Sequence, residues 1–218
     1  MTLTPSMRTG VLVLLLVPFL AGSGCISLEK PYPQKRFFSI RTEREGKTRD
    51  PVSSVTVEVR SFRTAPPHDR EEFAYRRGEN SYDSDFYNLF VAPPSRLLTE
   101  EVRRWLRDSN LFAHLVTPGS RVSATHYVEG FVTALHGDYR PDEDPAAVLE
   151  IQFLFFEETL DDTRIIFQKA FQERVPLKEG RDADALVRAW TEALRRVLQA
   201  FESGLSEPAS RAALGAAD

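Results

Sequence analysis

Cysteine is almost absent from this sequence of 218 residues, which has a single one, Cys25. One thiol excludes a disulfide within the chain and cannot complete a zinc site built from paired cysteines. The four histidines, His68, His114, His126 and His136, show no spacing typical of metal ligands. Glycine-rich phosphate loops and the nucleophile elbow of hydrolases are also missing. We therefore predict no metal, no cofactor and no catalytic residue.

An excess of basic residues is missing as well. Residues 1–24 contain Arg8 and no acid, so the other 194 residues carry 27 basic and 32 acidic side chains. Nucleic-acid-binding domains usually present a strongly basic face. We expect no nucleic-acid partner.

A hydrophobic run long enough to cross a membrane is lacking too. The apolar run 11–20 has about half of the roughly 20 residues that a spanning helix needs, and Pro18 interrupts it. A short segment charged only at Arg8 precedes the run, and four small residues, 21–24, follow it. This is the layout of a secretory signal peptide. We predict that residues 1–24 are removed on export.

The cysteine stands directly after this signal. Gly24-Cys25 is similar to the lipobox of bacterial lipoproteins, although Gly22 occupies the position where leucine is usual. In lipoproteins the thiol receives lipid and becomes the mature N-terminus; a thiol suits this role because part of it is thiolate at neutral pH. Ile26 stands where aspartate would retain such a protein at the inner membrane. We predict lipidation of Cys25 and outer-membrane anchoring towards the periplasm; the alternative is an incidental cysteine.

The remaining chain reads as one folded domain with two flanking segments. Residues 25–35 are polar with two prolines and form a lipidated tether, 36–205 form a single α+β domain, and 206–218 form a disordered tail. Strand patterns occur at 36–40, 53–62, 71–78, 83–92, 111–116, 126–135, 146–158 and 163–175. We expect the strand 146–158 to be internal, since both its faces are apolar.

Two segments have the periodicity of amphipathic helices. The first opens at Pro93-Pro94-Ser95 and ends near Asn110, with Leu98, Val102, Trp105 and Leu106 on one face. The second spans about 182–203, and Gly204 is predicted to end it as a left-handed residue. We predict a two-layer α+β sandwich in which a largely antiparallel sheet is covered on one face by both helices.

Aromatic and basic residues gather around a hairpin turn predicted at 78–80. Tyrosine and arginine are typical anchors of protein interfaces. We predict partner contacts by five residues of this stretch: Tyr75, Arg76, Arg77, Tyr82 and Tyr87. The alternative is that the aromatic side chains pack beneath the first helix. Asp83 and Asp85 are interpreted as turn residues and not as a general acid and base.

Several blocks, in order, make the sequence similar to the ABC-type transport auxiliary lipoprotein family. They are Cys25, FFSI, VEVRSF followed by YRRG, FVAPPSRLLTEEVRRWLRDSNLF, HYVEGFV, AVLEIQFLF and IIFQKAFQERVPL. The resemblance implies a non-enzymatic, periplasm-facing lipoprotein of the outer membrane. It also implies an MCE-domain protein as partner and, through it, an ABC permease and ATPase that move phospholipids or other hydrophobic molecules. The lipoprotein would dock this assembly at the outer membrane, and self-association is left open.

Two other functions compete with this interpretation. One is a lipoprotein that assists the assembly of outer-membrane barrels or secretion. The other is an envelope hydrolase, which would need a pocket with a converging acid, base or nucleophile.

Overall fold

The computed structural model describes residues 34–46, 51, 53–207 and 210. The elements in chain order are β1 (Arg36–Phe38), β2 (Ser53–Val59), β3 (Arg63–Thr64), the 3-10 helix η1 (Pro66–His68), β4 (Glu72–Arg76), β5 (Tyr82–Phe90), α2 (Pro94–Ser109), β6 (Phe112–Val116), β7 (His126–Asp138), β8 (Ala146–Glu158), β9 (Thr163–Pro176) and α3 (Ala183–Leu205). The compact unit that holds these elements begins at Gln34. The predicted signal peptide and Cys25 lie outside the described residues. Within the described part, no helix has the length and apolarity needed to span a membrane.

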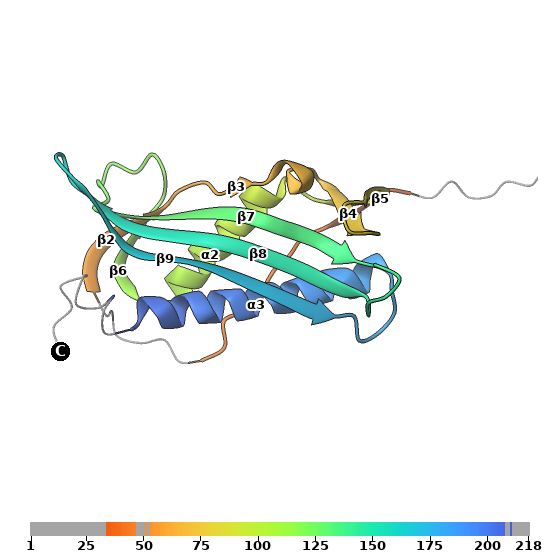
Figure 1. Ribbon diagram of the computed structural model, residues 1–218. Coiled ribbons are helices and arrows are strands. Elements are labelled where there is room, and N and C mark those ends of the chain that lie inside the picture. The colour runs from red at the N-terminus through yellow and green to blue at the C-terminus, as the bar shows by residue number, and fades with distance from the viewer. Residues whose placement is uncertain (1–33, 47–50, 52, 208–209, 211–218) are drawn as a thin grey trace, which may run out of the picture. The chain divides into compact units, whose positions relative to one another are not determined.

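Strand β7 organises one mixed sheet (Figure 1). On one side it pairs antiparallel with β8, which pairs antiparallel with β9. On its other side the short strands β2, β3 and β4 each pair with it in parallel. Strand β6 adds to β2 in parallel, and β5 and then β1 continue the sheet from β4. The predicted antiparallel pairing is confirmed for the long strands, while the short strands contribute parallel pairs that alternation of residues does not reveal.

Helix α2 forms where the sequence predicts it. It begins at Pro94, and Asn110 after its last residue adopts a left-handed φ of 52°. The predicted apolar face is confirmed, because Leu98, Val102, Trp105 and Leu106 are all buried. Proline suits the first turn because its missing N–H would have no partner there.

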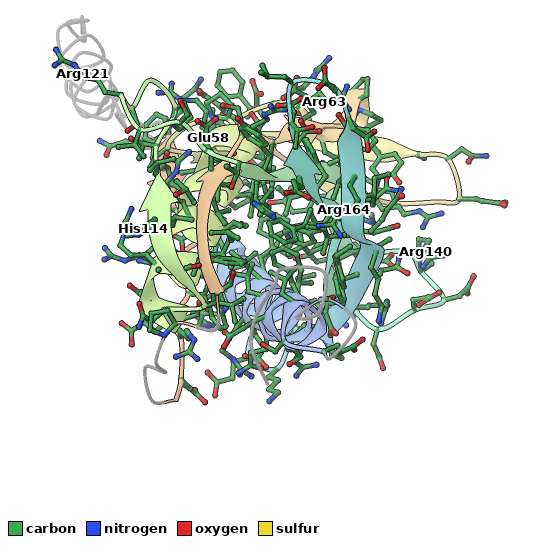
Figure 2. All side chains as sticks on the ribbon, turned by 90° about the vertical axis from the view of Figure 1, so that its left-hand side faces the viewer. Glu58, Arg63, His114, Arg121, Arg140 and Arg164 are labelled. Atoms are coloured by element: carbon green, nitrogen blue, oxygen red, sulfur yellow. The ribbon has the colours of Figure 1, made fainter. Side chains whose placement is uncertain are left out.

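Helix α3 packs against the same face of the sheet as α2. The Asp182 carboxylate caps its N-terminus by accepting a hydrogen bond of 2.9 Å from the Ala185 backbone N–H. Figure 2 shows α3 end-on, with β6 and β9 on opposite sides of it. The predicted two-layer α+β arrangement is confirmed.

The prediction for Gly204 is wrong. Gly204 is part of α3, which continues to Leu205, and it is not a left-handed residue. A Cβ at this position would lie 2.6 Å from the Phe167 ring of β9. The glycine is needed because the helix approaches the strand closely, which the helical pattern cannot show.

The core lies between the sheet and the helices. Leu149, Ile151 and Phe153 on the helix-facing side of β8 are fully buried, and β8 is internal as predicted. The Phe153 ring stacks on Phe201 of α3 with 4.0 Å between centroids. Fully burying such a side chain stabilises the fold by roughly 1.5–3 kcal/mol, so this layer fixes the position of α3.

A buried ion pair joins the two helices to the segment after β1. The Arg44 guanidinium donates from Nε and Nη2 to the Glu202 carboxylate at 2.9 and 2.8 Å. Trp105 Nε1 of α2 donates to the same carboxylate at 2.9 Å. The side chains of Arg44 and Glu202 are only 7% and 10% exposed. Glu202 therefore links three segments that are far apart in the sequence.

The predicted tail at 206–218 is described only in part. The Ser210 hydroxyl donates to the Gly204 carbonyl at 3.0 Å, and Ser210 is buried. The other residues of this segment, apart from Ser206 and Glu207, lie outside the described part.

Candidate interaction surface

The hairpin of β4 and β5 forms around the predicted turn. Tyr75 pairs with Asp83, and Arg76 pairs with Tyr82. The Arg76 guanidinium donates to the carbonyls of Gly78 at 3.2 Å and Glu79 at 2.8 Å. Arg76 thus holds the turn of its own hairpin.

Tyr75 of β4 and Arg77, directly after β4, lie on the same side of the hairpin. The Tyr75 hydroxyl donates to Asp85 Oδ2 at 2.6 Å, and its ring packs edge-on against Tyr139. Burial and the Asp85 carboxylate raise the pKa of Tyr75 above its ordinary value, so Tyr75 stays a donor. Arg77 lies over both rings, 5.5 and 5.2 Å from their centroids, and its Nε donates to Asp83 at 2.9 Å.

This face borders a cleft between the hairpin and the start of α3. The cleft has a volume of about 530 Å³ and is lined by Arg36, Tyr75, Arg77, Tyr139 and Arg181, among others. We call it the hairpin cleft. Asp85 and Asp182 also line it, but three arginines outnumber these two carboxylates. With the tyrosines, these arginines suit the binding of a polar, partly anionic protein surface.

The carboxylates in the hairpin are held by hydrogen bonds. Burial opposes ionisation of Asp85, but hydrogen bonds from Tyr75, the Asn88 side chain and the backbone N–H groups of Tyr87 and Asn88 lower its pKa. Asp83 is exposed and pairs with Arg77. Both carboxylates therefore orient the hairpin, but they lie in β5 and not in the turn itself, so their interpretation as solvated turn residues is wrong in position.

Tyr82 belongs to the opposite face from Tyr75. It is 42% exposed, and its ring packs edge-on against His68 and His136, with centroid distances of 5.8 and 5.5 Å. The five predicted partner residues thus do not form one patch. Tyr75 and Arg77 line the hairpin cleft, Arg76 and Tyr82 face away from it, and Tyr87 is exposed on β5 outside the lining of the cleft. Their role in partner binding stays a prediction.

The packing alternative holds for another aromatic residue. Phe90 at the end of β5 is buried against Phe73 and Trp190, with centroid distances of 4.6 and 5.4 Å. Trp190 belongs to α3. Phe90 is therefore buried as the alternative expects, but it packs against the second helix and not the first. Phe37 is not among the predicted surface residues, because the segment 36–40 is interpreted only as a strand. Phe38 faces the core beside Phe73, whereas Phe37 is 60% exposed.

Two buried histidines stack beneath Tyr82. The rings of His68 and His136 lie 5.3 Å apart, and neither nitrogen of His136 has a hydrogen-bond partner within the described residues. Burial, together with the positive charges of His68, Arg76 and Arg140, outweighs Asp138 and lowers the pKa of His136 to about 4. His136 is therefore neutral at pH 7.

Acid is expected to destabilise the protein through His136. The ordinary histidine pKa of 6.5 applies to the unfolded chain, so between pH 6.5 and about 4 the unfolded state binds more protons. The free energy of unfolding should fall by up to about 3 kcal/mol as the pH drops through this window. Urea unfolding of the native protein and of His136→Gln at pH 7 and about pH 4.5 measures the difference. An equal pH dependence in both proteins would contradict this assignment, and His114→Gln, which alters an exposed residue of β6 (Figure 2), is the control.

The histidines are not grouped as metal ligands. Within the described part, no group of three or more His, Cys, Asp or Glu residues is placed to hold a metal ion. His126 is buried against Phe155, and its pKa is lowered by burial.

The fold defines an α+β protein class that occurs among solved structures. A Xanthomonas campestris protein of the DUF330 family matches with a TM-score of 0.70 at 17% identity, over 82% of this chain and 98% of its own. An uncharacterised protein matches with a TM-score of 0.58 at 14% identity, over 78% and 97%. A search of family models and a search of curated proteins found no match for this chain. At these identities the likeness shows a shared fold.

Proposed function

We propose that the chain is a periplasm-facing lipoprotein, anchored to the outer membrane through Cys25, that acts as a non-enzymatic auxiliary component of an ABC-type, MCE-linked transport system. It docks the transport assembly, which moves phospholipids or other hydrophobic molecules, at the outer membrane. The observation that carries the proposal is the small-residue and cysteine motif directly after an export signal, followed by one folded domain.

The ordered sequence blocks support the proposal because those within the described residues fall on structural elements or continue directly from them. FVAPPSRLLTEEVRRWLRDSNLF runs from the end of β5 through α2 into β6, and HYVEGFV and AVLEIQFLF lie in the central strands β7 and β8. YRRG begins in β4 and includes Arg77 at the hairpin cleft. The blocks thus include both the sheet core and the surface proposed to meet the partner.

The hairpin cleft is the surface proposed for the MCE-domain partner. Arg77 offers a cation already positioned by two aromatic rings, and its bond to the exposed Asp83 is easily exchanged for a partner carboxylate. Arg77 is a better test residue than Arg76, which holds the turn.

Replacing Arg77 with glutamate is expected to reduce co-purification of the MCE-domain protein severalfold. The experiment uses cross-linked envelope membranes that contain the full-length acylated protein. Arg164→Glu is the matched control, because Arg164 is also an exposed, ion-paired arginine, placed on β9 (Figure 2). Thermal stability of both variants should stay near that of the native protein, since exposed ion pairs contribute about 0–1 kcal/mol.

Three results of this experiment have distinct meanings. Unchanged recovery of the MCE-domain protein with Arg77→Glu would remove the hairpin cleft from the interface. Recovery of a barrel-assembly or secretion component in place of the MCE-domain protein would favour the assembly function. Absence of the permease and ATPase from complexes with the native protein would contradict the transport proposal.

A further inference from the structure

Exposed apolar side chains gather at one end of the sheet. Phe37 and Phe86 are 60% and 65% exposed, Val91 is 54% exposed and Tyr87 is 36% exposed. All four lie in β1, in β5 or directly after β5. In a monomeric soluble domain such side chains normally occur singly, and an exposed group of them marks a binding surface.

The strand pairing places these residues together. Phe37 pairs with Leu89, and Tyr87 of β5 and Val91, directly after β5, stand two residues before and after Leu89. Residues two apart on a strand share a face. The Phe86 ring packs edge-on against Tyr87 at 5.2 Å, which adds it to the group. We call Phe37, Phe86, Tyr87 and Val91 the aromatic patch.

The patch lies on the side of β1 and β5 that faces away from the core. The alternate residues point to α3: Arg36 binds Asp184 at 2.7 Å, and Phe90 packs on Trp190. Leu89 on this outer side is only 6% exposed, whereas the four residues of the aromatic patch are 36–65% exposed.

A basic group borders the patch. It is Lys35, whose ammonium lies 4.5 Å from the centroid of the Phe86 ring. Phenylalanine and tyrosine beside a lysine are typical of surfaces at the membrane interface, where the rings enter the headgroup boundary and the cation meets a lipid phosphate.

The chain enters the domain at this patch. Nine residues lie between Cys25 and Lys35, and even when fully extended the ten steps from one Cα atom to the next span only about 35 Å. The domain therefore cannot leave the vicinity of a bilayer in which Cys25 is anchored. Among the described residues, Leu160 in the β8–β9 turn and Ile165 near the start of β9 are also strongly exposed, as is Val122 in the loop between β6 and β7. The β8–β9 turn lies at the opposite end of the sheet from β5 (Figure 1).

We propose that the aromatic patch rests in the headgroup region of the periplasmic leaflet of the outer membrane and fixes the orientation of the domain on it. The inference rests on the proposed function, because it takes the acylated Cys25 as the anchor. The domain would then direct the β8–β9 turn away from the membrane and hold the hairpin cleft close to it. A partner docking at the cleft would be held beside the lipids.

A label at position 86 tests this orientation. The acylated full-length protein has no free thiol, so Phe86→Cys introduces the one that reacts with an environment-sensitive fluorophore. Leu160→Cys, at the β8–β9 turn, is the matched control. Both proteins are bound to vesicles of phosphatidylethanolamine and phosphatidylglycerol that carry a headgroup-region quencher.

The expected result is strong quenching at position 86 and none at position 160. Equal quenching at both positions, or none at position 86 in a protein that floats with the vesicles, overturns the inference and leaves the lipid anchor intact. A label at 86 that responds to the MCE-domain protein without vesicles, and not to vesicles, also overturns it and assigns the patch to that partner. A protein without acyl mass that does not float overturns the proposed function together with the inference.

Discussion

Replacing Glu202 with alanine is expected to lower the free energy of unfolding by about 3–5 kcal/mol. The substitution leaves the buried guanidinium of Arg44 without the carboxylate that now accepts two of its hydrogen bonds. It also removes the acceptor of the Trp105 indole N–H. An uncompensated buried charge costs more than the pair itself contributes, so the loss should exceed that of any exposed ion pair in the protein.

Glu192→Ala is the matched control for this prediction. Glu192 lies in the same helix and pairs with Arg195 and Arg196, but its side chain is 34% exposed. Its replacement should cost no more than about 1 kcal/mol. Urea unfolding followed by tryptophan fluorescence reports both variants. A Glu202→Ala variant as stable as Glu192→Ala would show that the buried pair does not hold the segment after β1 against the helices.

The elements with regular apolar periodicity could be predicted from the sequence. Helix α2 has its boundaries and its buried face where the spacing of Leu98, Val102 and Trp105 places them. The two predicted hairpins, β4–β5 and β8–β9, are local in sequence, so alternation and turn residues suffice to find them. These features depend on neighbours a few residues away.

The features that were missed depend on distant contacts. The parallel pairing of β1 with β5 joins segments about 50 residues apart, and no local pattern encodes it. Gly204 was interpreted as a helix end because the Phe167 ring, which requires the glycine, belongs to another element. Arg44 and Glu202 are ordinary charged residues in the sequence until the fold buries them together.

The candidate site shows the same limit. Its location at the hairpin followed from the density of aromatic and basic residues, which is a local property. The division of Tyr75 and Tyr82 between two faces could have been inferred from alternation along the strands. The exposure of Phe37 could not have been inferred in this way. It follows from the packing of the neighbouring Phe38 against Phe73 in the core.

Replacing Cys25 with alanine is expected to release the protein from the membrane. Several acyl chains contribute about 0.8 kcal/mol for each buried methylene, which makes anchoring durable, whereas the aromatic patch alone provides only a few side chains. The variant should be exported and folded, since the described domain begins at Gln34. Ser27→Ala, two residues away, is the matched control and should stay anchored.

The lipid anchor on Cys25 is the central claim, and the most direct measurement is the intact mass of the protein purified from a bacterial envelope, combined with membrane fractionation. The account predicts that the native protein and Ser27→Ala begin at an acylated Cys25 and sediment with the outer membrane, while Cys25→Ala has no acyl mass and stays in the periplasmic fraction. An unmodified Cys25 in a native protein recovered from the periplasmic fraction would contradict the account.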